Sequence, residues 1–339
     1  MGRPFHLADD GWLDIGSYGR HGPGRRDALS PAQIDFIART VRGTPEVMVK
    51  MLNRGGQNVR SVGQHLQYLS RDGSVAIDTD TGDRLRGPDA GKAVIDDWDL
   101  DLDEGRQTTD LKPRVMKNSP KLVHKMVFSM PAGTPPDKVL RAVALFAREE
   151  FGMKHRYAMV LHTDQAHPHV HLVVKSVGHD GRRLNIRHST LRIWRREFAR
   201  QLRAQGVAAN ATERVVRGVN RLQKMDAVYR AARRQESTHW DQRKREVADV
   251  LKRNGVVAEA AGEKLRGTRR TVLEGWSEIE RVLTMQGRED LAKSVHQLAR
   301  GMQPALTDRE FIASRVQPRL QSPALEEHAR AEREFELMR

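Results

Sequence analysis

The spacing of apolar and polar residues divides the chain into a region with both strands and helices and a following region with helices alone. Strands are predicted where short β-rich runs are bounded by turn residues, at 46–52, 74–87 (a hairpin), 121–131, 156–164 and 169–178. Helices are predicted where apolar residues recur every three or four positions, at 31–40, 58–70, 135–152 and 188–206. This order of elements predicts an α/β sandwich, in which helices flank a mostly antiparallel central sheet.

Composition changes along the chain suggest three segments. Residues 1–45 are rich in Gly and Arg and carry one helix signal, which predicts an N-terminal extension. Residues 46–220 contain every predicted strand and form the expected α/β domain. Residues 221–339 are rich in Arg, Lys, Glu and Gln at helical spacing, which predicts a helical, basic C-terminal region. No apolar run reaches the roughly 18 residues of a transmembrane helix, and we expect no export signal and no membrane insertion.

The charge balance then narrows the class of partner. The 339 residues include 59 Lys and Arg against 44 Asp and Glu, so the formal net charge is +15. Such an excess indicates a polyanion, although net charge alone does not separate nucleic acid from an anionic membrane surface. The chain has no cysteine, which excludes disulfide scaffolds, thiolate metal sites and thiol nucleophiles.

Histidines cluster in the sequence HTDQAHPHVH, which spans His162 to His171. On a strand, His167, His169 and His171 share one face, but the outer two lie about 13 Å apart, too far to bind one metal ion easily. His169 and His171 can converge, and a third ligand is best placed on the neighbouring strand. We therefore predict His162, His169 and His171 as metal ligands.

Two further residues of this segment are expected to support the ligands. Metal-bound imidazoles usually donate their other N–H group to a carboxylate or a carbonyl, and Asp164 and His167 lie close enough in sequence to accept it. Three protein ligands with open positions are typical of a catalytic metal site. Unrelated exposed or core histidines are the alternative, which four histidines within ten residues disfavour. A His-x-His pair alone also occurs in zinc hydrolases and cupin-type oxygenases.

A nucleophile for phosphate chemistry has few candidates, because the chain has four tyrosines. Tyr68 lies on the polar side of the predicted helix 58–70, away from the apolar stripe of Val62, Leu66 and Leu69. On spacing alone, a tyrosine that packs at the helix edge is the simpler interpretation.

Three segments, in order, resemble the motifs of conjugative relaxases, and in particular the MOBP class that includes the T-DNA border endonucleases. These enzymes belong to the histidine–hydrophobic–histidine endonuclease superfamily and nick DNA at an origin of transfer. The segments read GGQNVRSVGQHLQYLSRDG, FSMPAGTPP and HTDQAHPHVHLVV. The resemblance implies that residues 46–220 form a relaxase domain.

The resemblance also implies roles for single residues. Tyr68 would be the nucleophile that forms a 5′-phosphotyrosine, and Ser129 would contact DNA beside the nick. The third motif would contain His162, Asp164, His169 and His171. Asp164 would orient a histidine or accept a proton. The additional acidic residue of the family stays open among Asp72 and the acids between Asp96 and Asp110.

A cofactor and partners follow from the same resemblance. It implies a divalent metal, Mg²⁺ or Mn²⁺ with Zn²⁺ as an alternative, and single-stranded and origin-of-transfer DNA as the substrate. It further implies accessory relaxosome proteins and the coupling protein of a type IV secretion channel. The protein would be cytoplasmic in a bacterium and exported while covalently attached to DNA.

Arginines alternate with aromatic residues at 181–203, which suits contacts to phosphates and stacked bases. The residues predicted to bind DNA there are Arg182, Arg183, Arg187, Arg192, Trp194, Arg195 and Arg196. A solvated helix face with Trp194 and Phe198 in the core is an equally good interpretation.

Three other functions fit parts of this pattern. A rolling-circle replication initiator also has a histidine–hydrophobic–histidine motif, but its tyrosine follows the histidines, which would nominate Tyr229. A histidine-metal hydrolase or oxygenase would act on a small substrate and not on DNA. A nucleic-acid-binding protein with a structural metal site would have no cleavage activity.

Overall fold

The chain forms two compact units, each described here by itself. The computed structural model describes residues 11–18, 28–52, 56–110, 120–219, 238–253, 255, 257 and 259–320. The described residues between 42 and 211 form the sheet unit, and residues 11–41 together with the described residues from 212 onward form the helical unit. The segment 1–45, which the sequence groups as one extension, is therefore divided: residues 11–41 pack with the C-terminal helices.

The described part of the sheet unit contains one six-stranded sheet in which every neighbouring pair of strands is antiparallel. The strand order is β1-β4-β6-β5-β2-β3. The strands are β1 (Met48–Leu52), β2 (Ile77–Thr79), β3 (Arg84–Leu85), β4 (Val123–Ser129), β5 (Tyr157–His162) and β6 (His169–Lys175). This architecture, with its flanking helices, confirms the predicted α/β class.

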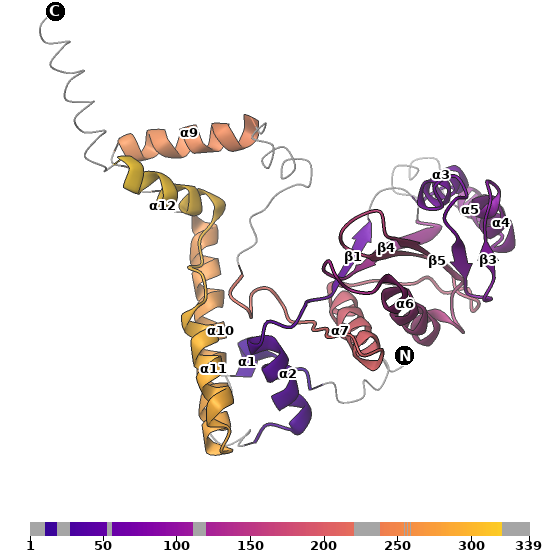
Figure 1. Ribbon diagram of the computed structural model, residues 1–339. Coiled ribbons are helices and arrows are strands. Elements are labelled where there is room, and N and C mark those ends of the chain that lie inside the picture. Colours follow the sequence, from indigo (N-terminus) through magenta and orange to yellow (C-terminus); the bar gives the residue numbers. More distant parts are fainter. Residues whose placement is uncertain are drawn as a thin grey trace, which may run out of the picture. The chain divides into compact units, whose positions relative to one another are not determined.

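Helices α6 (Pro136–Phe151) and α7 (His188–Ala204) cover one face of the sheet (Figure 1). Their core is built around aromatic rings, in which Phe128 of β4 lies 5.0 Å from the ring of Phe146 and 5.2 Å from that of Phe198. Edge-on and tilted contacts of this kind stabilise aromatic pairs beyond the area that they bury.

Helices α3 (Val59–Leu69), α4 (Ala90–Asp97) and α5 (Leu100–Asp110) lie on the other face, which we call the α3 face (Figure 1). Helix α3 begins at Asn58, whose side chain accepts a hydrogen bond from the Ser61 amide at 2.8 Å. Its apolar stripe packs on strand residues of β2, β5 and β6.

Strand alternation decides which side chains reach the α3 face. On β6, Val170, Leu172 and Val174 belong to the core under α6 and α7, so the odd-numbered residues point to the α3 face. On β5, Ala158 and Val160 pack in the α3 core, so the even-numbered residues do the same. His162, His169 and His171 therefore share the face that α3 covers.

The described helices of the helical unit are α1 (Ile15–Tyr18), α2 (Pro31–Val41), α9 (Thr238–Lys252), α10 (Ala260–Met285), α11 (Glu289–Arg300) and α12 (Asp308–Leu320). Trp276 of α10 is fully buried in the main core, and its indole Nε1 donates to the Val216 carbonyl at 2.9 Å. Helices α9 and α12 share a smaller core. Across the described residues, no helix combines the length and the apolar character that a membrane crossing needs.

Two glycines of α10 give a matched test of this packing. A Cβ atom at Gly275 would lie 1.8 Å from the Ile15 carbonyl oxygen, whereas one at Gly267 would meet nothing within 4 Å. We expect Gly275→Ala to lower the free energy of unfolding by about 2 kcal/mol or more, because backbone must move. Gly267→Ala should raise it by about 0.5–1 kcal/mol through helix propensity. Urea unfolding of both variants measures this, and equal effects would contradict the close contact.

Candidate active site

The three histidines predicted as metal ligands converge at one end of the sheet. Each offers one ring nitrogen, and these three atoms lie within 4.8 Å of one another. The ring centroids are 5.2 Å apart for His162 and His169, 4.8 Å for His162 and His171, and 5.3 Å for His169 and His171. The strand register explains the convergence, since His162 of β5 lies directly opposite His169 of β6. We call this group the histidine triad.

Backbone carbonyls orient two of the three rings. His162 Nε2 lies 2.8 Å from the carbonyl oxygen of Leu69, and His169 Nδ1 lies 3.1 Å from that of His167. A ring nitrogen that faces a carbonyl carries the proton, which leaves Nδ1 of His162 and Nε2 of His169 as lone-pair donors. His167 thus contributes its main chain, while its exposed side chain makes none of the described contacts with the triad.

Burial keeps two triad imidazoles neutral. His162 is 4% exposed, and desolvation lowers its pKa despite the hydrogen bond to Leu69. Desolvation and the neighbouring His162 and His169 lower the pKa of His171 to about 3. Neutral imidazoles are the form that binds a metal, so these side chains fit a divalent cation.

Tyr68 lies in the last turn of α3 with 61% of its surface exposed. The next residue, Leu69, is the one whose carbonyl is bonded to His162. The nucleophile predicted from the first motif is therefore held next to the triad by its own backbone, with its hydroxyl-bearing ring open to solvent.

Arg71 connects Tyr68 with the third motif. Its guanidinium carbon lies 5.0 Å from the centre of the Tyr68 ring, and its Nη2 donates to Asp164 Oδ2 at 2.6 Å. Hydrogen bonds to Tyr68 and Asp164 raise the pKa of Arg71. For Asp164, partial desolvation alone would raise the pKa, but the bond from Arg71 outweighs it and the pKa falls. The carboxylate is therefore committed to Arg71, and none of the described hydrogen bonds joins it to a histidine.

The turn after α3 has an unusual backbone. Arg71 and Asp72 have φ angles of 51° and 55°, in the left-handed region that residues other than Gly, Asn and Asp seldom adopt. Gly73 follows at 90°. Such conformations are retained where surrounding contacts require them, and here they aim Arg71 back over Tyr68.

Four adjacent strands place one residue each in a row at this end of the sheet. Met48 pairs with Ser129, Ser129 with His169, and His169 with His162. Ser129 is buried, while Met48 at the sheet edge is 45% exposed. Lys50, two residues further along β1, points to the same α3 face and is exposed. Met48 and Lys50 belong to none of the three motifs, and the alternation of side chains along β1 is what places them on this face.

The arginines predicted to bind DNA lie elsewhere in the sheet unit. Arg183 donates to the Lys121 carbonyl at 3.0 Å, at the end of β4 opposite Ser129. Arg182 lies in the same loop, and Arg187 immediately precedes α7. The remaining three, Arg192, Arg195 and Arg196, are on α7, which packs on the sheet face opposite the triad.

The prediction that Trp194 stacks on bases is wrong for this structure. Its side chain is 1% exposed, and its ring packs 5.5 Å from Phe151 and 6.0 Å from Phe146 in the core under α7. Burial against aromatic partners leaves no face of the indole open to a base.

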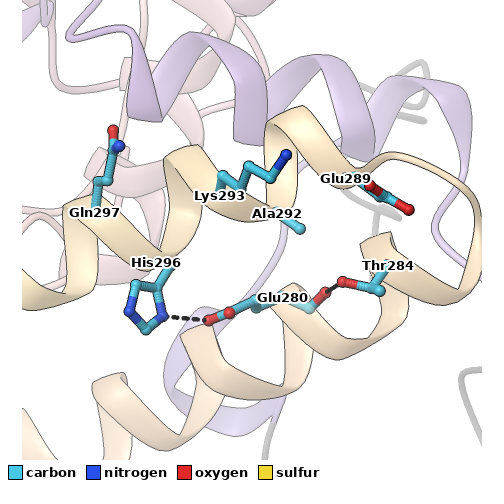
Figure 2. A pocket seen from close by; sticks show the side chains of 7 residues that line it. All are labelled: Glu280, Thr284, Glu289, Ala292, Lys293, His296 and Gln297. Atoms are coloured by element: carbon cyan, nitrogen blue, oxygen red, sulfur yellow. Dashed lines mark hydrogen bonds and ion pairs between the residues drawn. The ribbon is translucent and has the colours of Figure 1, made fainter.

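One of the acids left open for an additional active-site role, Asp103, lies away from the triad. Asp103 Oδ2 lies 3.1 Å from Lys175 Nζ, at the end of β6 opposite His169. Within the described ranges, the triad is the one group of three His or acidic side chains whose ligand atoms converge. Figure 2 shows a pocket between α10 and α11, where His296 Nδ1 lies 3.2 Å from Glu280 Oε2 without a third converging ligand.

Comparisons with known proteins agree with the resemblance drawn from the motifs. Residues 81–207 match the family model "Relaxase: MobA/VirD2-like, nuclease domain", a stretch that includes Ser129 and the triad and begins after Tyr68. This match confirms the resemblance to relaxases.

Curated relatives point the same way. The T-DNA border endonuclease VirD2 of Rhizobium radiobacter is 26% identical over 190 residues, covering 51% of this chain and 43% of the relative. VirD2 of Agrobacterium fabrum is 25% identical over 205 residues, covering 57% and 45%. The chain thus spans less than half the length of these relatives. No solved structure matches the chain.

Proposed function

We propose that the chain is a site- and strand-specific DNA relaxase, on the premise that residues 81–207 match a relaxase nuclease domain. One observation carries the proposal: the turn that contains Tyr68 and Arg71 is bonded to both His162 and Asp164. Tyr68, a cation and a set of metal ligands thereby lie at the same end of the sheet unit. A covalent band between the protein and single-stranded DNA, requiring Tyr68, tests the proposal.

The proposed reaction exchanges one phosphodiester for another. The Tyr68 oxygen forms a bond to phosphorus while the bond from phosphorus to the 3′ oxygen of the preceding nucleotide breaks. The tyrosine proton leaves as this bond forms, and the departing 3′ oxygen gains a proton. The products are a 5′-phosphotyrosine and a free 3′-hydroxyl. Because no water is consumed, the same steps in reverse religate the strand.

The histidine triad is proposed to hold a divalent metal. Two of its rings already present a lone pair in the required tautomer, which is the observation that supports the fit. Imidazole donors bind Mn²⁺ and Zn²⁺ more strongly than Mg²⁺, so Mn²⁺ is a suitable probe, although Mg²⁺ can serve in cells. A metal bound here would polarise the scissile phosphate and offset charge on its oxygens.

Arg71 and Asp164 are proposed to support the nucleophile. The guanidinium over the Tyr68 ring stabilises the negative charge that develops on the tyrosine oxygen. Asp164 holds that guanidinium through its hydrogen bond, and the left-handed backbone at Arg71 fixes its direction. The hydrogen bond from His162 Nε2 to the Leu69 carbonyl holds this turn at a fixed position beside the triad.

DNA is proposed to follow the row from the triad past Ser129 toward the sheet edge, where Met48 and Lys50 are exposed. We expect Lys50→Ala to weaken binding of a single-stranded oligonucleotide about 3- to 10-fold and to reduce the salt slope of log K by about 0.7. Fluorescence anisotropy at several salt concentrations measures both quantities. Arg141→Ala, an exposed position of α6 over the opposite sheet face, is the matched control, and a larger loss there would contradict this path.

The wider role is proposed to be conjugative transfer, with nicking at an origin of transfer in a bacterial cytoplasm. Accessory relaxosome proteins would present the DNA, and a type IV coupling protein would receive the covalent complex for export. The basic helical unit is the proposed place for such contacts.

The rolling-circle alternative places the nucleophile at Tyr229, which lies outside the described residues. The small-substrate hydrolase or oxygenase alternative predicts metal binding without a DNA adduct. A structural metal site predicts that loss of a ligand unfolds the sheet unit.

A further inference from the structure

Two buried ring nitrogens between α3 and the sheet have no hydrogen-bond partner. They are Nε2 of His65 and Nδ1 of His171. The two rings lie edge-on, with centroids 6.3 Å apart and an interplanar angle of 75°. His65 is half-buried on α3 and precedes Tyr68 by three residues, one helical turn. The relaxase resemblance assigns no role to His65.

A comparison of the three triad histidines shows that His171 has no acceptor for a ring N–H group. An imidazole that binds a metal through one nitrogen carries its proton on the other, and that N–H needs an acceptor. The Leu69 carbonyl serves His162, and the His167 carbonyl serves His169. His171 is the triad member without such an acceptor, although its Nδ1 is shielded from water.

We propose that His65 is a positioning residue whose Nε2 accepts the hydrogen bond of His171 Nδ1–H, so that His171 presents Nε2 to the metal. With the centroids 6.3 Å apart, the two nitrogens stay at least about 4 Å from each other even when they face one another, so the bond requires the rings to approach by about 1 Å through rotation about both the Cα–Cβ and the Cβ–Cγ bonds. The role in metal binding rests on the proposed function. If the proposal is correct, His65, which orients the ligand His171, and Tyr68, the proposed nucleophile, lie on the same helix one turn apart.

Metal affinity of the full chain tests the proposal. We expect His65→Leu to raise the Mn²⁺ dissociation constant at least 10-fold in isothermal titration calorimetry, the range found when ligand-orienting groups are removed. His65→Gln should stay within about 3-fold of wild type, because its side-chain oxygen accepts a hydrogen bond near the position of Nε2. Equal weakening by Leu and Gln, or none by Leu, would overturn the role.

His124→Leu is the matched control. His124 is also half-buried on the sheet unit, and desolvation together with Lys121 lowers its pKa to about 4. It pairs with Val174, away from the triad, so its loss should leave Mn²⁺ affinity unchanged. An equal loss of affinity in this control would attribute the effect of His65→Leu to general destabilisation and overturn the specific role.

The tautomer of His171 gives a second readout that needs neither metal nor a folded Leu variant. Nitrogen-15 spectra of the histidine rings in the metal-free wild type should show His171 protonated at Nδ1 and His65 unprotonated at Nε2. The proposal is overturned if His171 carries its proton on Nε2. A wild-type chain that binds no Mn²⁺ would refute the metal in the proposed function, and the tautomer would still decide whether the bond exists.

Discussion

Replacing Tyr68 with phenylalanine is expected to abolish the covalent adduct with single-stranded DNA that the proposed function predicts. The substitution removes one oxygen from a side chain that is 61% exposed, so the fold should persist while the nucleophile is lost. Loss of a nucleophile commonly costs about 10³-fold or more in rate, because no other group occupies its position. The measurement is a gel shift in denaturing conditions, with Mn²⁺ and single-stranded oligonucleotides from the DNA that flanks the gene of this chain.

Tyr229→Phe is the matched control for this experiment. Under the relaxase proposal it should form the adduct at the wild-type rate, because the nucleophile lies before the histidines in sequence. Under the rolling-circle alternative, Tyr229→Phe should lose the adduct and Tyr68→Phe should form it at the wild-type rate. An adduct that survives loss of Tyr68 would refute the assignment of the nucleophile, whatever the metal requirement.

The part of this site that could be predicted depends on local geometry. A two-residue period on one strand and a short turn to its neighbour restrict which histidines can converge, and the structure brings together the three chosen on that basis. The sheet and its covering helices follow from periodic apolar positions in the same way. The stacking role predicted for Trp194 was wrong because a tryptophan between arginines can belong either to the exposed face or to the buried face of a helix. The four-residue spacing of Trp194 and Phe198 puts both on the buried face of α7.

The remaining features depend on contacts between distant segments. Arg71 meets Asp164 across 93 positions, and the Leu29 amide meets Gln286 Oε1 across 257. No local pattern encodes such pairs, so the link between Arg71 and Asp164 and the packing of residues 11–41 with α10 could not be predicted from one sequence. His65 was missed for the same reason, since its position facing His171 depends on how α3 lies on the sheet.

The second large effect is expected from His169→Ala, which removes a proposed ligand at the edge of the site. We expect Mn²⁺ affinity to fall by at least about 10²-fold, and DNA cleavage to fall by a similar or larger factor, because charge on the phosphate is no longer offset. Calorimetry with Mn²⁺ and the adduct assay measure these two quantities. Chelation of the wild type with EDTA should give the same loss of cleavage, and added Mn²⁺ should restore it.

His167→Ala is the control that this chain offers two residues away. His167 supplies its carbonyl to His169 Nδ1, and the carbonyl remains when the side chain is removed. Its affinity and cleavage should therefore stay near wild type, although both histidines belong to the same motif. If both variants lose activity equally, the motif would act through its total charge and not through a defined ligand set.

If His169→Ala instead unfolds the sheet unit, seen as a lower urea midpoint, the metal site would be structural. Retention of adduct formation after complete chelation would remove the metal from the reaction and leave Arg71 as the cation that lies over the Tyr68 ring.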